Sequence, residues 1–147
     1  MKPFDDLLER ARANPKHIAL AEGEDPRIVQ GAVRAAREGL ARVTLLGDEA
    51  TVREAAAAGG EGLNIAVVEP AKSPDFDNFA ELYCEMRRHK GMDPETARAT
   101  MRQPLYFANM MVRGGQADGT IAGAANTTAD TVRAAIQVIG VGKRYEM

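Results

Sequence analysis

Cysteine, histidine and long apolar runs are scarce in this sequence, and each scarcity argues against a class of protein or of site. Cys84 is the only cysteine among 147 residues, so no disulfide can form within the chain. His17 and His89 are the only histidines, and no histidine or cysteine spacing typical of a metal site occurs. No apolar run approaches the ~20 residues that span a bilayer, and a polar amphipathic segment, unlike a signal peptide, follows Met1. We therefore expect a cytoplasmic protein without a metal site.

A basic excess is also missing. The net charge is −2 and the sequence pI is near 5.7, which gives no support for binding to nucleic acid, because such proteins usually carry a basic surface. The chain is otherwise ordinary for a globular protein, with 45% hydrophobic and 27% charged residues. Its length is sufficient for one domain with a real core.

Short apolar segments alternate with helical patterns along the chain. The predicted strands are His17–Ala21, Arg42–Leu46, Asn64–Val68 and Gly119–Ala122. The predicted helices are Phe4–Ala13, a helix between Pro26 and Gly39, Glu49–Ala58, Asp75–His89, Asp93–Met101, Pro104–Arg113 and a last one that begins at Asn126 to Thr128. Alternation of this kind is typical of parallel strands covered on both faces. The sequence therefore predicts a doubly wound parallel α/β fold.

The stretch from Ala117 to Ile139 combines a strand, a loop of small residues and a helix. Residues 123–125 read Gly-Ala-Ala, so another group can approach their backbone closely. A helix start offers N–H groups and the positive end of the helix dipole, which favour an anion. Thr127 and Thr128 add hydroxyl donors, and Arg133 adds a positive charge. The pattern is consistent with a phosphate loop.

Ordinary helix features explain the same residues equally well. Thr127 and Asp130 have a spacing similar to that of a capping box, and Arg133 can pair with Asp130 three residues before it. The apolar residues of this helix follow the i, i+3, i+4, i+7 rule and predict one buried face, made of Val132, Ala135, Ile136 and Ile139. The pattern alone leaves an anion site and a plain capped helix both open.

The same stretch, A-D-G-T-I-A-G-A-A-N-T-T-A-D-T-V-R-A-A-I-Q-V-I-G, resembles a segment of phosphate acetyltransferases (phosphotransacetylases), of the phosphate acetyl/butyryl transferase family. Residues 87–92 resemble that family's R-x-x-K-G segment, and residues 104–112 are similar to its next helix. The resemblance implies the isocitrate/isopropylmalate dehydrogenase-like fold. Because the family continues into another strand and a second domain, residues 1–147 are expected to be the N-terminal part of such a domain, without its remainder.

The resemblance also implies an activity, the reversible transfer of an acetyl group between coenzyme A and phosphate. Arg87 and Arg133 match family arginines that are associated with binding of coenzyme A or phosphate, and Thr127 and Thr128 are expected to donate to phosphate oxygens. Coenzyme A would be a substrate, with no tightly bound cofactor and no metal. The family's serine, arginine and catalytic aspartate lie in its C-terminal domain, so no catalytic residue is expected here, and residues 1–147 alone should be inactive.

Several further expectations accompany this assignment. The partners would be coenzyme A, acetyl phosphate, phosphate and a second copy in a homodimer, with neither nucleic acid nor a membrane. Glu22 and Asp25 also lie in a segment that matches the family, but a loop carboxylate and a helix cap explain them, so we assign neither to the site. Cys84 is expected to be a buried structural thiol.

Two alternative functions stay open at this point, and a third is disfavoured. One is a phosphate butyryltransferase, although the segment around Thr127 favours acetyl. Another is a non-catalytic domain that senses acyl-CoA, similar to those fused to malic enzymes; the start at Met1 without an upstream domain favours the stand-alone enzyme. A nicotinamide-binding Rossmann domain lacks support, because no G-x-G-x-x-G follows the first strand.

Overall fold

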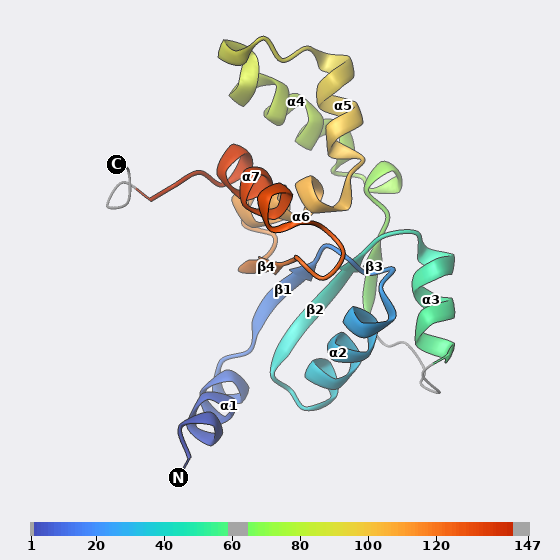
Figure 1. Ribbon diagram of the computed structural model, residues 1–147, viewed down its shortest axis with the longest axis vertical. Helices are drawn as coiled ribbons and strands as arrows, with labels where there is room; N and C mark the ends of the chain where they lie inside the picture. Colours follow the sequence, from blue (N-terminus) through green and yellow to red (C-terminus); the bar gives the residue numbers. More distant parts are fainter. Residues whose placement is uncertain (1, 59–64, 143–147) are drawn as a thin grey trace.

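The computed structural model describes residues 2–58 and 65–142, which fold into helices around one sheet (Figure 1). The α-helices are α1 (Pro3–Ala13), α2 (Pro26–Arg37), α3 (Glu49–Ala58), α4 (Phe76–Arg87), α5 (Pro94–Met101), α6 (Pro104–Arg113) and α7 (Thr128–Val138). The strands are β1 (Lys16–Leu20), β2 (Ala41–Leu46), β3 (Ala66–Val68) and β4 (Gly119–Ile121). Short 3₁₀ turns occupy η1 (Pro70–Lys72) and η2 (Arg88–Lys90).

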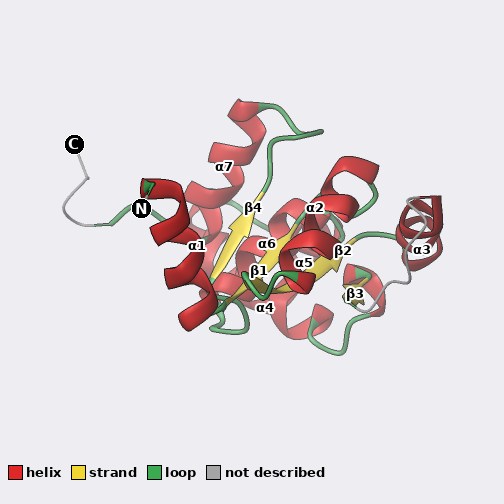
Figure 2. Ribbon diagram, turned by 90° about the horizontal axis from the view of Figure 1, so that it is seen from below, coloured by secondary structure: helices red, strands yellow, loops and turns green. Residues whose placement is uncertain are grey.

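The described strands form one parallel sheet in the order β3-β2-β1-β4. β1 lies between β2 and β4, and its Ile18 is in register with Val43 on one side and Gly119 on the other. Figure 2 shows α3 beyond the β3 end of the sheet and α7 beside β4. The predicted parallel α/β fold is confirmed, while the dehydrogenase-like fold implied by the resemblance stays a prediction.

Helices cover the sheet on both faces, because successive strand residues alternate between two apolar clusters. Leu45 packs on the side of α2 and α3, and Leu46 packs on the side of α4 to α7. On the second side the largest buried side chains include Tyr83, Phe107, Met101 and Met110. The predicted buried stripe of α4 and the buried helix α6 are therefore confirmed. Cys84 is buried in the same cluster, as expected.

The element boundaries differ slightly from the sequence-based ones. The helix predicted to reach His89 ends at Arg87 and tightens into η2, and Gly91 follows with a left-handed φ of +81°. The third strand was predicted from Asn64, which lies outside the described residues, as does the glycine-rich loop predicted at residues 59–62; β3 is described from Ala66. These shifts leave the order of the elements unchanged.

The predicted buried face of α7 is wrong. Val132 and Ile136 are 50% and 51% exposed, and Ile139 is also exposed, while the residues of α7 that are fully buried are Ala134 and Val138. The helix contacts α6 and buries Ala134 and Val138 in the core, while Val132, Ile136 and Ile139 point outward. Helical periodicity identified an apolar face correctly, but nothing in the described residues covers it.

Gly23 holds the turn after β1 against the end of β2. Its N–H donates to the Leu46 carbonyl at 3.0 Å, and a Cβ at this position would lie 2.6 Å from that oxygen. A Cβ at Gly31, within α2, would meet no heavy atom within 4 Å apart from its chain neighbours and the backbone of its own helix. We expect Gly23→Ala to lower the free energy of unfolding by about 1–3 kcal/mol.

The matched change Gly31→Ala should instead raise the free energy of unfolding by about 0.5–1 kcal/mol, because alanine is favoured over glycine inside a helix. Urea denaturation of both variants measures the two effects. Equal effects of the two substitutions would show that the close approach at Gly23 is unimportant.

Candidate functional site

The turn after β1 and the loop after β4 meet at the carboxyl ends of the two neighbouring strands, and Glu22 joins them. Its Oε1 accepts hydrogen bonds from the backbone N–H groups of Gly123 and Ala124, both at 2.8 Å. Its Oε2 accepts from those of Ala125 and Asn126, at 2.5 and 2.6 Å. The side-chain amide of Asn126 donates to the same oxygen at 3.1 Å.

The small-residue loop therefore binds an anion, but the anion is the protein's own carboxylate. The N–H groups of residues 123–126 are therefore not free for phosphate, because Glu22 accepts from all four, while an anion site at the start of α7 stays a prediction. Burial acts to raise the pKa of Glu22, but the four backbone hydrogen bonds outweigh it and the pKa is lowered. The side chain is only 8% exposed, and it stays ionised at neutral pH.

Thr127 is the N-cap of α7. Its hydroxyl accepts from the Asp130 N–H at 3.1 Å and donates to the Asp130 carboxylate at 2.8 Å. This hydrogen bond, together with the Arg133 guanidinium, lowers the pKa of Asp130. Thr128 begins the helix and is exposed. The geometry of Thr127 thus follows the capping alternative, and contact of either threonine with a substrate stays a prediction.

Arg87 and Arg133 line one polar cavity of about 460 Å³. The cavity lies between the end of α4, the start of α6 and one side of α7, and α5 reaches it through Thr100. The other lining residues are Tyr83, Met92, Thr100, Gln103, Leu105, Tyr106, Asn126, Asp130 and Gln137. The structure thus brings the two sequence-predicted arginines together, although they are far apart in the chain.

The two arginines keep donors available to a ligand. Arg133 donates to Asp130 at 2.8 Å in a half-exposed i, i+3 pair, which contributes little stability and can be exchanged. The Nε atom of Arg87 is buried and has no hydrogen-bond partner among the described residues. An unpaired buried donor is costly, and Arg87 also lines the cavity.

Two tyrosines and a glutamine form one wall of the cavity. The hydroxyls of Tyr106 and Tyr83 donate to the Gln137 side-chain oxygen at 3.0 and 3.4 Å. Their rings meet edge to face with centroids 6.0 Å apart. Burial raises the pKa of both tyrosines, so both keep their protons at neutral pH. Sequence reasoning missed Tyr106 and Gln137, and it assigned Tyr83 only to the core.

A second cavity of about 310 Å³ adjoins the first and shares Gln103, Leu105 and Asn126 with it. Its other end is acidic, but the carboxylates there are engaged. Glu24 accepts from the Asp48 N–H at 3.1 Å. Asp25 caps α2 and binds Arg27, whose side-chain hydrogen bonds lower the Asp25 pKa to about 2. Asp25 is therefore the predicted helix cap, whereas Glu22 has a larger part than sequence reasoning gave it.

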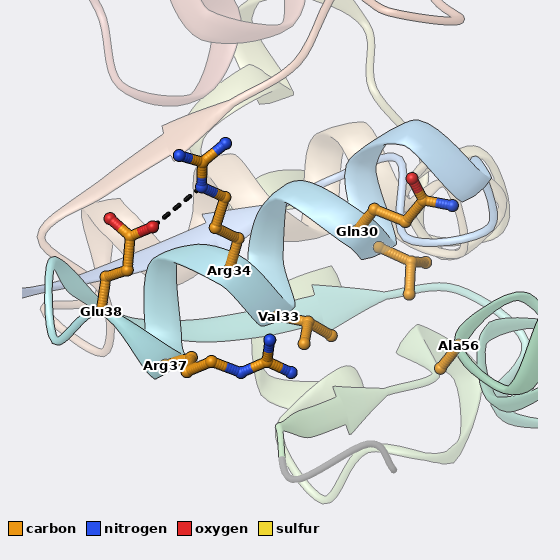
Figure 3. Close-up of a pocket in the computed structure, with 7 residues that line it drawn as sticks. Gln30, Val33, Arg34, Arg37, Glu38 and Ala56 are labelled. Carbon is orange, nitrogen blue, oxygen red and sulfur yellow. Dashed lines mark hydrogen bonds and ion pairs between the residues drawn. The ribbon is translucent and has the colours of Figure 1, made fainter. Parts of the chain in front are cut away.

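A third cavity, of about 350 Å³, lies between α2 and α3 (Figure 3). Aliphatic side chains and an ion pair between Arg34 and Glu38, at 2.8 Å, line it. None of the candidate site residues lines it, and its one lining carboxylate, Glu38, is paired with Arg34. We assign it no function.

The described residues hold no cluster of three or more histidine, cysteine, aspartate or glutamate side chains suited to a metal ion. Within the same part of the chain, no helix is long and apolar enough to cross a membrane. Among the described residues that line the arginine cavity, Asp130 is the only carboxylate, and it is bound to Thr127 and Arg133. A base for catalysis is therefore not evident among the lining residues.

The fold and the site define a class of protein, a parallel α/β domain with a cationic cavity near the carboxyl ends of its strands, where α/β proteins commonly bind ligands. Residues 4–147 match the family described as "Phosphate acetyl/butaryl transferase", and the chain belongs to this family.

Relatives named as phosphate acetyltransferases agree with this assignment. The protein of that name from Paracoccus denitrificans is 48% identical over 140 residues, which are 95% of this chain and 41% of that protein. The one from Corynebacterium glutamicum is 42% identical over 134 residues, 90% of this chain and 41% of that protein. The chain therefore spans about two fifths of the length of these relatives.

Solved structures lead to the same family. The crystal structure of a phosphotransacetylase from Streptococcus pyogenes superposes with a TM-score of 0.87 at 34% identity, covering 94% of this chain and 43% of that chain. The EutD phosphotransacetylase from Staphylococcus aureus gives a TM-score of 0.89 at 30% identity, covering all of this chain and 46% of that one.

Proposed function

We propose that this chain is the phosphate- and coenzyme-A-binding part of a phosphate acetyltransferase, which catalyses acetyl-CoA + phosphate ⇌ coenzyme A + acetyl phosphate. The observation that carries the proposal is the convergence of Arg87 and Arg133 on one polar cavity in a member of this family. The names of the relatives favour acetyl over butyryl as the transferred group.

The proposed reaction forms one bond and breaks another. The thiol sulfur of coenzyme A attacks the carbonyl carbon of acetyl phosphate, a C–S bond forms, and the C–O bond to the leaving phosphate breaks. The thiol has an ordinary pKa near ~8.5, so a base must accept its proton. Negative charge collects on the departing phosphate, and cationic donors placed around it lower the barrier.

The arginines have the chemistry for this charge. A guanidinium presents a planar fork that can bind two phosphate oxygens at once. In the proposal, Arg133 exchanges Asp130 for the substrate, and Arg87 offers a second guanidinium from the same cavity lining. Tyr83 and Tyr106 stay protonated and fix the polar wall through Gln137. In this proposal, these residues bind and orient the anion. The proposed reaction uses no metal and no tightly bound cofactor.

We further propose that residues 1–147 are the N-terminal part of a larger catalytic domain. Three observations support this: the chain spans about two fifths of its relatives, β4 is an edge of the described sheet, and α7 exposes Val132 and Ile136. An uncovered apolar helix face beside an open sheet edge is unusual in a complete domain. The base would then come from the remainder of that domain.

The apolar face of α7 gives this arrangement a mutational test. In the complete protein, Ile136→Lys should lower the free energy of unfolding by about 1.5–3 kcal/mol, the amount gained by burying one aliphatic side chain. In residues 1–147 alone, the same substitution is on the surface and should change it by less than about 0.5 kcal/mol. Denaturation of both forms measures the difference; equal effects would contradict a cover on this face.

The proposed activity is tested with the complete protein, coenzyme A and acetyl phosphate, by following thioester formation. Turnover with acetyl phosphate well above that with butyryl phosphate is expected. The reverse preference would make the protein a butyryltransferase. Tight binding of coenzyme A without any turnover would instead identify an acyl-CoA-sensing domain.

Two properties of the whole protein belong to the same proposal. We propose a homodimer, which light scattering on the purified complete protein tests directly. We also propose that the reaction takes place in the cytoplasm, which cell fractionation followed by the thioester assay tests.

A further inference from the structure

Glu22 lies at the centre of the contacts between two chain segments that are 101 to 104 residues apart. Its two oxygens accept from five N–H donors of residues 123–126, as described above, and the side chain is buried. Gly123 allows the loop to close around the carboxylate, because its φ of +111° is a conformation that other residues rarely adopt. The loop shape and the carboxylate thus depend on each other.

Asn126 connects this arrangement to the arginine cavity. It donates twice to Glu22, through its backbone and through its side chain, and it also lines the cavity beside Arg133. The next residue, Thr127, caps α7 and holds Asp130, and Asp130 in turn binds Arg133. Hydrogen bonds, together with the peptide bond between Asn126 and Thr127, therefore connect Glu22 to the guanidinium of Arg133.

We propose that Glu22 is a positioning residue, whose carboxylate fixes Asn126 and the first turn of α7 so that Arg133 faces the anionic substrate. This inference rests on the proposed function, since it concerns the same cavity. Glu22 itself does not contact the substrate in this account, because both of its oxygens are occupied by the loop.

The chemistry of the loop requires a carboxylate at this position. An amide offers one acceptor oxygen and one donor group, so Glu22→Gln would turn N–H donors toward two of the loop N–H groups. Glu22→Asp keeps both oxygens and the charge on a side chain shorter by one methylene. The glutamine variant should therefore disturb the loop more than the aspartate variant, although glutamine is closer than aspartate to the shape of glutamate.

The experiment uses the complete protein and compares Glu22→Gln, Glu22→Asp and Asp48→Asn. Asp48 accepts from the Thr51 N–H at the start of α3, and it is absent from the residues that line the arginine cavity, so Asp48→Asn is a matched change of carboxylate to amide away from that cavity. We expect Glu22→Gln to lower kcat/KM about 10²-fold, as for a misplaced site, Glu22→Asp to recover part of the loss, and Asp48→Asn to stay within about twofold of the wild type.

A double-mutant cycle distinguishes positioning from general stability. The effects of Glu22→Gln and Arg133→Ala on kcat/KM should be clearly less than additive, because both disable the same guanidinium. Additive effects, or a Glu22→Gln enzyme with wild-type kinetics, overturn the inference. Should Glu22→Gln fail to fold, the cycle is run with Glu22→Asp and judged in the same way.

Binding of coenzyme A, measured by calorimetry, separates this inference from the proposed function. If the wild-type protein shows no turnover, the proposed function is contradicted. The inference about Glu22 is then tested by comparing the dissociation constants for coenzyme A of the wild type and Glu22→Gln. Weaker binding by Glu22→Gln, with Asp48→Asn unchanged, supports it, and equal binding by all three overturns it.

Discussion

Replacement of Arg133 by alanine in the complete protein should lower kcat/KM for acetyl transfer by about 10²–10³-fold. A loss of that size is typical when one donor to the charge of a transition state is removed. Arg133 lines the cavity, and its partner Asp130 holds it only by a half-exposed ion pair. Arg87→Ala should have a loss of the same order, because Arg87 is the second guanidinium that lines the same cavity. The thioester assay, with each substrate varied in turn, measures both.

Arg88→Ala is the matched control for these two variants. Arg88 neighbours Arg87 in the sequence but is mostly exposed and pairs with Glu85 at 2.7 Å. It is not among the residues that line the arginine cavity. Its loss should change kcat/KM by no more than about twofold, since an exposed ion pair contributes ~0–1 kcal/mol. An equal loss in all three variants would indicate a general effect of charge and not a defined site.

Residues 1–147 alone should show no measurable acetyl transfer. Loss of a general base typically lowers the rate by ~10²–10⁴-fold, and loss of part of the cleft removes substrate positioning as well. Within the described part of the chain, Asp130 is the only carboxylate lining the cavity; it is occupied by Thr127 and Arg133, and its pKa is lowered, so it is a poor base for a thiol.

The measurement is the thioester assay on the purified 147-residue chain beside the complete protein at equal concentration. A folded chain, verified by circular dichroism, is required for the comparison. Turnover similar to that of the complete protein would mean that the base lies within these residues. The proposal that the remainder of the domain supplies the base would then be wrong.

Local patterns were sufficient to predict the fold. Each strand is a short apolar segment between turn residues, and α2, α5 and α7 each begin behind a side-chain cap, Asp25, Asp93 and Thr127. Such signals depend on neighbours in the sequence, and the alternation of strands and helices predicted the parallel pairing but not the strand order β3-β2-β1-β4. The buried stripe of α4 was predicted for the same reason.

Long-range contacts could not be predicted in the same way. The loop before α7 has the composition of an anion-binding loop, but its anion comes from Glu22, 101 residues before Gly123. No sequence period relates these two positions. Tyr106 and Gln137 likewise meet only through packing of α6 against α7. The exposed face of α7 shows a related limit, because periodicity identifies an apolar face and does not say which part of a protein covers it.

The most direct test of the account is a crystal structure of the complete protein with coenzyme A and phosphate bound. The account predicts phosphate oxygens within hydrogen-bonding distance of both Arg87 and Arg133, the Arg133–Asp130 pair opened, and the Glu22 carboxylate still enclosed by residues 123–126. Phosphate and coenzyme A bound away from this cavity, with Arg133 still paired only to Asp130, would contradict it.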